Sequence, residues 1–257
     1  MGKAKLILAA AFISGLLAGR LQAQDGPQLY NMGFDEWSKN KGVWYPYAAD
    51  ASPSQRIWDS GNAGLHTLGM TSVSPEYKHV AVPGEGKAAA RIESKKIAWA
   101  FVAGNLYSGK FIRMVEMKGA ESLLGAPFTA RPKRLSGYYH YIPKKINNAK
   151  APYESMAGKM DEALIEVLLM DWDKPYQQVT HRDGFIDAEK DPHIIGRAFL
   201  VIKRGTSGYV HFDIPVTYRN GKTPRYASFT LTGSRLGAYQ TGASGSVLYV
   251  DELRFEY

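Results

Sequence analysis

The sequence predicts an all-β fold, a two-layer antiparallel β-sandwich. The composition is the first observation: the 257 residues include 26 Gly, 16 Tyr, 10 Phe and 5 Trp, and glycine-rich turns between aromatic strands are typical of β proteins. The second observation is a series of short apolar or alternating runs that end at turn residues. About ten such runs fit a single sandwich.

The expected strands follow one another along the chain. Each is five to eight residues long, or slightly more, and rich in β-branched or aromatic residues. The segment 163–172 is ambiguous, because Leu164, Val167 and Leu168 also fit a helix, but its β-branched content and its end at Asp-Trp-Asp-Lys-Pro favour a strand. The runs that we assign as strands span residues 97–102, 137–142, 163–172, 198–202, 209–214 and 226–232.

The C-terminal strand contains a change of parity. Leu248 and Val250 are apolar at even positions, whereas Leu253 and Phe255 are apolar at odd positions. A strand alternates its side chains between two faces, so one regular strand cannot place both sets on the same face. A β-bulge near Asp251 would reconcile them. The alternative is that the even positions face a second layer.

The first 23 residues have the pattern of a secretory signal. Lys3 and Lys5 precede an apolar stretch, and Leu-Gln-Ala at 21–23 ends in a small residue, which predicts cleavage after Ala23. The apolar stretch is short for a membrane span, which needs about 20 residues. We therefore expect a signal peptide at 1–23 and a single domain at 24–257, exported to the periplasm or the extracellular space.

Composition excludes several classes of protein. The chain has no cysteine, which excludes disulfides, thiolate metal sites and a lipoprotein anchor. Without the basic residues of the signal, 29 basic residues stand against 24 acidic ones, a net charge of +5. This mild excess contains no dense basic run, so nucleic acid is not an expected partner. No second stretch is apolar enough to span a membrane.

Several motifs of catalytic sites are incomplete. Residues 104–111 nearly match a phosphate-binding loop, but Phe111 stands where Ser or Thr would hold magnesium. Residues 242–246 lack the spacing of a nucleophile elbow, and the six histidines form no zinc motif. Asp171 and Asp173 could act as acid and base in glycoside hydrolysis, or they could form a solvated turn.

Aromatic residues near the start of the mature chain are a stronger signal. Trp37, Trp44, Tyr45, Tyr47 and Trp58 lie among Gly, Asn, Asp and Ser rather than within apolar strands. The apolar faces of sugar rings pack on aromatic rings while neighbouring polar groups bind the hydroxyls. These residues indicate carbohydrate binding. The alternative is that they cap the core beneath long loops.

Six blocks of sequence together resemble the putative carbohydrate metabolism domain family of secreted gut-type bacterial proteins. The likeness extends over about residues 29–257. It implies a jelly-roll sandwich similar to carbohydrate-binding modules, related to galactose-binding-like domains, and a role in polysaccharide use. The blocks that carry it are residues 31–37, 58–64, 103–111, 127–132, 137–141 and 245–252.

A wider likeness to jelly-roll sugar-binding modules implies a structural Ca²⁺. Such modules hold the ion between an early Gly-Phe-acidic segment and a late Tyr-Val-Asp-acidic strand. The corresponding ligands here are Asp35 and Asp251. The position of Asp251 agrees with the bulge expected there.

The sequence thus predicts a secreted protein that binds carbohydrate. Trp44 and Trp58 are the candidate stacking platforms. Asn62 and Asn105 could offer a donor and an acceptor to vicinal hydroxyls, and Arg131 could bind two hydroxyls or the carboxylate of an acidic sugar. The alternatives are a glycoside hydrolase or lyase that uses paired carboxylates on the same scaffold, and an adhesive surface protein.

Overall fold

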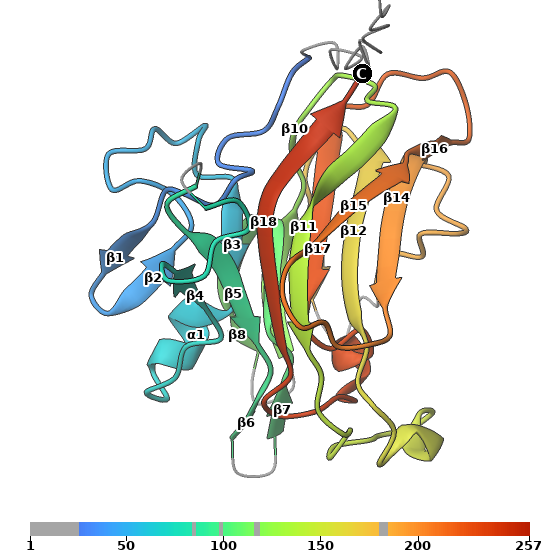
Figure 1. The fold of residues 1–257 in the computed structure, drawn as a ribbon. Coiled ribbons are helices and arrows are strands. Elements are labelled where there is room, and N and C mark those ends of the chain that lie inside the picture. The colour runs from blue at the N-terminus through green and yellow to red at the C-terminus, as the bar shows by residue number, and fades with distance from the viewer. Residues whose placement is uncertain (1–25, 84–85, 98–99, 116–118, 180–184) are drawn as a thin grey trace, which may run out of the picture.

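Two antiparallel β-sheets face each other across one hydrophobic core (Figure 1). The computed structural model describes residues 26–83, 86–97, 100–115, 119–179 and 185–257. The predicted all-β, two-layer sandwich of jelly-roll type is confirmed. The expected signal at 1–23 lies outside the described residues.

The larger sheet has nine strands. The ambiguous segment 163–172 contains strand β12, which lies between two other strands of this sheet. The strand assignment is therefore confirmed. The strand appears nearly continuously apolar because both of its faces are covered: Ile165 and Val167 face the main core, whereas Leu168 packs in a smaller cluster with Trp172. The strands, in spatial order, are β13 (Tyr176–Val179), β9 (Gly119–Leu124), β8 (Asn105–Val115), β17 (Tyr226–Thr232), β12 (Ala163–Met170), β14 (Ile194–Ile202) and β16 (Thr217–Tyr218), with β10 (Ala126–Pro127) beside β17 and β3 (Trp58–Ser60) beside β8.

The smaller sheet has five strands, and two hairpins flank the sandwich. The sheet order is β15 (Val210–Pro215), β11 (Arg134–Ile142), β18 (Val247–Glu256), β5 (Ala89–Glu93) and β4 (Val73–Glu76), and the hairpins are β1 (Ser38–Asn40) with β2 (Val43–Tyr45) and β6 (Lys95–Ile97) with β7 (Ala100–Val102). The prediction of one strand over 97–102 is wrong. Ile97 pairs with Ala100 across a tight hairpin, and residues 98 and 99 lie outside the described residues.

Among the described residues, helices are few and short. They are α1 (Asn62–His66) and the 3₁₀ turns η1 (Glu154–Met156) and η2 (Gly237–Tyr239). In the described part of the chain, none of them has the length and apolar character needed to cross a bilayer.

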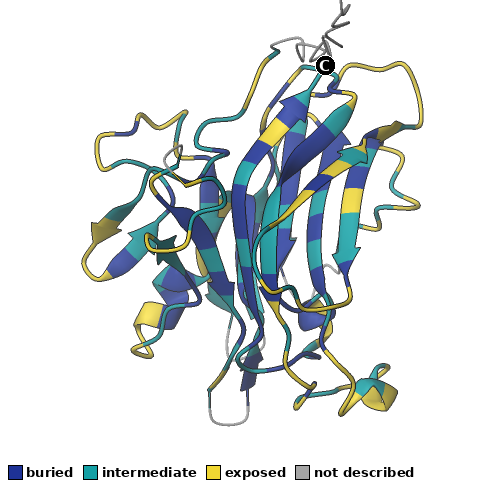
Figure 2. Cartoon of the chain, in the orientation of Figure 1, coloured by how far each residue is buried: buried dark blue, intermediate teal, exposed yellow. Residues whose placement is uncertain are grey.

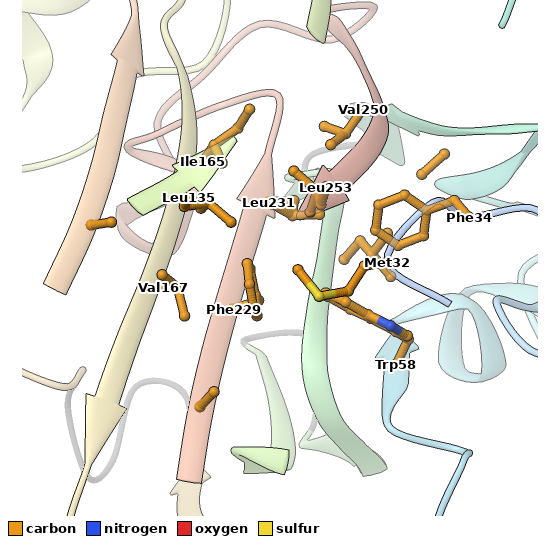
Figure 3. Packing of buried hydrophobic residues seen from close by; sticks show 14 of the residues in the cluster. Met32, Phe34, Trp58, Leu135, Ile165, Val167, Phe229, Leu231, Val250 and Leu253 are labelled. Atoms are coloured by element: carbon orange, nitrogen blue, oxygen red, sulfur yellow. The ribbon is translucent and has the colours of Figure 1, made fainter. Parts of the chain in front are cut away.

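Buried residues are concentrated in the strands of both sheets, whereas most exposed residues lie in the loops (Figure 2). Trp58 lies at the centre of an aromatic cluster, with ring centroids 5.1 Å from Phe34 and 5.2 Å from Phe229. Met32 and Phe34 bring the N-terminal segment into the same core (Figure 3). Apolar packing of Met32 and Phe34 therefore fixes this segment on the sandwich.

The predicted bulge in the C-terminal strand is confirmed. The pairing of β11 with β18 shifts from Ser136 opposite Arg254 to Tyr138 opposite Asp251, so β18 uses one extra residue. At the bulge, Glu252 adopts a left-handed backbone conformation with a φ of 49°. Leu253 therefore faces the core, as Val250 does, despite the opposite parity.

Candidate functional site

A cleft of about 820 Å³ opens on the outer face of the five-stranded sheet. Its floor is formed by β11, β15 and β18, and its wall by the N-terminal segment 26–36. In Figure 1 this segment, in blue, enters beside the C-terminal end of β18, in red. The polar side chains that line the cleft are Gln28, Tyr30, Asn31, Asp35, Glu36, Ser136, Tyr138, His211, Glu252 and Arg254.

One side of the cleft is aromatic. Tyr138 in β11 lies opposite His211 in β15 in the register of the two strands. Leu135, three positions before Tyr138, and Phe212, next to His211, are buried against the core. Alternation along each strand therefore turns Tyr138 and His211 outward. The two rings meet edge to face, with centroids 5.0 Å apart and planes at 64°.

The other side of the cleft is acidic. A methyl group added to Gly86 would lie 3.0 Å from Glu252 Oε1 and 3.5 Å from Asp35 Oδ1, so the two carboxylates converge on one small space. Gly33 borders the same carboxylates: a Cβ added there would lie 3.4 Å from Glu252 Oε2. Asp35 Oδ1 also accepts hydrogen bonds from the backbone N–H groups of Lys87 and Ala88. Glycine at two positions thus keeps the acidic side open.

Backbone strain is concentrated at this cleft. Asn31, Phe34 and Glu252 all have positive φ, of 54°, 57° and 49°. Such conformations cost about 1–3 kcal/mol for residues other than glycine, and they cluster at functional sites. The side chain of Asn31 fixes the wall: its amide donates to the carbonyls of Glu36 and Pro46, at 2.9 and 3.0 Å, and its oxygen accepts the N–H of Glu36.

Asp251 lies behind the acidic side and is fully buried. Its carboxylate accepts the N–H of Ala81 at 2.7 Å and that of Glu252 at 2.9 Å. Burial, together with the nearby carboxylates of Glu252 and Asp35, raises the pKa of Asp251 to about 7, although the two N–H donors act in the opposite direction. Asp251 therefore ties the loop around Ala81 to the sheet.

The two predicted calcium ligands lie at the same corner of the molecule. Asp35 borders the cleft, and Asp251 lies behind it, close enough for the two charges to interact. Within the described ranges, no three His, Cys, Asp or Glu side chains gather to hold a metal ion. A calcium ion here would need backbone carbonyls or water among its ligands, which calcium accepts. The calcium site stays a prediction.

Trp58 is not a stacking platform, which corrects the sequence-based assignment. It is fully buried, and its indole N–H donates to the Tyr30 carbonyl at 2.8 Å. Pairing of β3 with β8 turns Trp58 toward the core. Trp44 is half-buried, with the ammonium of Lys39 at 5.1 Å from its ring.

The two predicted asparagines are also held by the fold. Asn62 is 2% exposed; its amide donates to Val73 and Trp44 carbonyls, and its oxygen accepts the N–H of Ser72. Asn62 is therefore not available to a ligand. Asn105 begins β8 opposite Thr232, and its side-chain oxygen is buried without a hydrogen-bond partner among the described residues, outside the cleft.

Arg131 holds a loop in place. Its guanidinium stacks on the Tyr218 ring at 3.9 Å and donates to the carbonyls of Asn220, at 3.0 Å, and Lys222. Of the five predicted sugar-binding residues, the structure brings only Trp44 and Asn62 into contact. None of the five lines the cleft.

Sequence reasoning missed Tyr138, His211, Glu36 and Glu252. The run around Tyr138 was recognised as a strand, and its alternation is the signal that could have placed this side chain outward. The alternative carboxylates at the end of β12 are each paired with a cation: Asp171 accepts from Lys222 Nζ at 2.6 Å and bonds His193 Nδ1 at 2.9 Å, and Asp173 accepts from Arg225. The Lys222 ammonium lowers the pKa of Asp171.

Comparison with known proteins bears on the family and the fold. A family model described as putative carbohydrate metabolism domain matches residues 33–256. No curated protein matches the sequence. Two solved structures are similar in fold at low sequence identity. A putative glycoside hydrolase from Bacteroides thetaiotaomicron has 18% identity and a TM-score of 0.66, covering 91% of this chain and 72% of that chain. A second, from Bacteroides vulgatus, has 20% identity and a TM-score of 0.65, covering 87% and 96%.

Proposed function

The chain belongs to the putative carbohydrate metabolism domain family, and from this premise we propose that its cleft binds carbohydrate. One observation carries the proposal: an open cleft of about 820 Å³ places an aromatic pair opposite converging carboxylates. Sugars offer both of the surfaces that such a site requires. Their C–H faces pack on aromatic rings, and their hydroxyls donate to carboxylates.

A pyranose ring fits this cleft in one general orientation. Its apolar face packs against Tyr138 and His211, and its hydroxyls point toward Asp35, Glu36 and Glu252. Hydrogen bonds to an ionised acceptor are roughly twice as strong as neutral ones. Because the strained wall is already fixed by Asn31, little conformational entropy is lost when the sugar binds.

The test is binding by the mature protein to an oligosaccharide array, followed by calorimetry with the best neutral ligand. Loss of the Tyr138 ring in Tyr138→Ala should cost about 1–3 kcal/mol of binding free energy. Tyr77→Ala is the matched control, because Tyr77 is 58% exposed and lies outside the cleft. Equal binding by Tyr138→Ala, His211→Ala and the parent would contradict the proposal.

The converging carboxylates favour a second candidate, glycoside hydrolysis in the same cleft. Retaining hydrolases place two carboxyl groups about 5–5.5 Å apart, one as acid and one as nucleophile. Asp35 and Glu252 are the pair to test. Release of reducing ends from a bound oligosaccharide, lost in both Asp35→Asn and Glu252→Gln, would support this candidate. Binding without any product would leave carbohydrate recognition alone.

Export belongs to the same proposal. A leader over 1–23 would deliver the domain to the periplasm or the outside of the cell, where polysaccharides are encountered. Mass spectrometry of the protein from its native envelope should find an N-terminus near Gln24. Recovery of mature protein that retains Met1 would contradict export by cleavage.

A further inference from the structure

A second hollow, of about 490 Å³, lies on the other side of the segment 28–30, which also forms part of the cleft wall. We call it the groove. Its walls are mostly apolar, and they include Leu29, Ile57, Leu123, Pro127 and Pro175. No described acidic side chain lines it.

The groove exists because β8 changes partners along its length. Residues 106–108 pair with β3, whereas β8 pairs with β9 from Gly109 onward. A Cβ at Gly109 would lie 2.0 Å from the Leu123 carbonyl oxygen, so only glycine fits where the strand turns away. Gly125 has a φ of +104°, a region that favours glycine. The floor of the groove is thus built by the backbone.

Two cationic side chains border the groove. Two contacts orient Arg56. Its Nε donates a hydrogen bond to the Ala51 carbonyl at 2.9 Å, and its guanidinium carbon lies 5.6 Å from the centre of the Tyr47 ring. Lys110 is exposed. Its acidic neighbour Asp59 already accepts the N–H groups of Phe111 and Ser60, each at 2.8 Å. The groove therefore combines apolar walls with two positive charges.

We infer that the groove binds a carboxylated sugar, a hexuronate unit of an oligosaccharide. A uronate has apolar C–H faces for the proline and leucine walls and a carboxylate for the Arg56 guanidinium, which can bind it through two parallel hydrogen bonds. The open shape suits a sugar ring rather than an acyl chain, which would require a tunnel. The acidic cleft repels the same ligand, so the two hollows would separate neutral from anionic sugars.

The experiment is calorimetry of the mature protein with trigalacturonate and with its methyl ester, which has the same rings without the charge. The acid should bind at least tenfold more tightly than the ester, and its affinity should fall as salt is raised from 20 to 200 mM, because exposed charges are screened. Arg56→Gln/Lys110→Gln should weaken binding of the acid at least tenfold. Lys203→Gln, an exposed lysine elsewhere, is the matched control and should bind as the parent does.

Any one of these results would overturn the inference: no binding of the acid by the parent, equal binding of acid and ester, unchanged binding by the double variant, or equal binding of a hexaglutamate peptide. Tyr138→Ala separates this site from the cleft. It should leave binding of the acid unchanged, and a loss there would assign the acid to the cleft instead. Circular dichroism confirms the folding of each variant.

Discussion

The cleft and the groove share one wall but differ in chemistry. Gln28, Leu29 and Tyr30 line both hollows, so this short segment lies between them. Beyond that wall the cleft contains carboxylates and an aromatic pair, whereas the groove contains prolines and two cations. A short segment of chain can therefore separate two binding surfaces of opposite charge.

The shared segment 28–30 is held by hydrogen bonds at both of its ends. Gln28 pairs with the backbone of Phe255 through both side-chain polar atoms, each at 2.8 Å. The Tyr30 carbonyl accepts the indole N–H of Trp58. The two hollows therefore depend on the same supports, although their ligands should differ.

Trp58→Ala should have the largest effect, because it affects the core and the wall together. Removal of a fully buried tryptophan costs about 3–5 kcal/mol of unfolding free energy, and the Tyr30 carbonyl loses its donor. Chemical denaturation measures the loss, and both ligands should bind more weakly. Trp58→Phe keeps most of the apolar volume and should lose less. A stability within 1 kcal/mol of the parent for Trp58→Ala would contradict a shared, core-supported wall.

Buried carboxylates beside both hollows should make the stability of the fold depend on pH, and Asp59 is the one beside the groove. Burial raises the pKa of Asp59 from 3.8 to about 6. Between these values the folded state binds more protons than the unfolded state, so stability falls as pH rises from about 4 to about 6. A difference of this size corresponds to roughly 3 kcal/mol at most. Burial also raises the pKa of Asp161 and Glu166, and that of Asp251 to about 7. These groups act with the same sign.

Thermal melts at pH 5 and pH 7 test this dependence. The parent should melt at a higher temperature at pH 5. Asp59→Asn cannot be protonated, so its melting temperature should change less between the two values. An equal change in parent and variant would show that Asp59 does not carry the effect.

Sequence predicted the strands better than the sites. Parity alone located the bulge near Asp251, because Val250 and Leu253 must both face the core, and the structure has the positive φ at the next residue, Glu252. The cleft could not be found in this way, since Asp35, Tyr138 and His211 meet only through the order of strands in space. Trp58 misled because its polar neighbours suggested a surface loop, whereas its pairing with β8 turns it inward.

Calcium should distinguish the cleft from the groove. An ion bound only by the folded state adds about 2.7 kcal/mol at a hundredfold excess over its dissociation constant, and only the cleft side has converging carboxylates. The melting temperature should rise from EDTA to millimolar Ca²⁺ in the parent and not in Asp35→Asn. Arg56→Gln, beside the groove, should respond as the parent does. Identical melting of the parent in EDTA and in Ca²⁺ would contradict the calcium site.

Arg131→Ala should have the smallest effect, because Arg131 lies outside both hollows. Its contact with the half-buried Tyr218 ring and its bond to the Asn220 carbonyl hold an exposed loop, and a cation–π contact at such a site contributes about 0.5–1 kcal/mol. Denaturation should detect a loss of that order. Calorimetry should find the affinities for the neutral ligand and for trigalacturonate unchanged. A tenfold loss of affinity for trigalacturonate alone would show that the anionic site is at the loop that Arg131 supports and not in the groove. A loss of affinity for the neutral ligand alone would show that the cleft site reaches Tyr218.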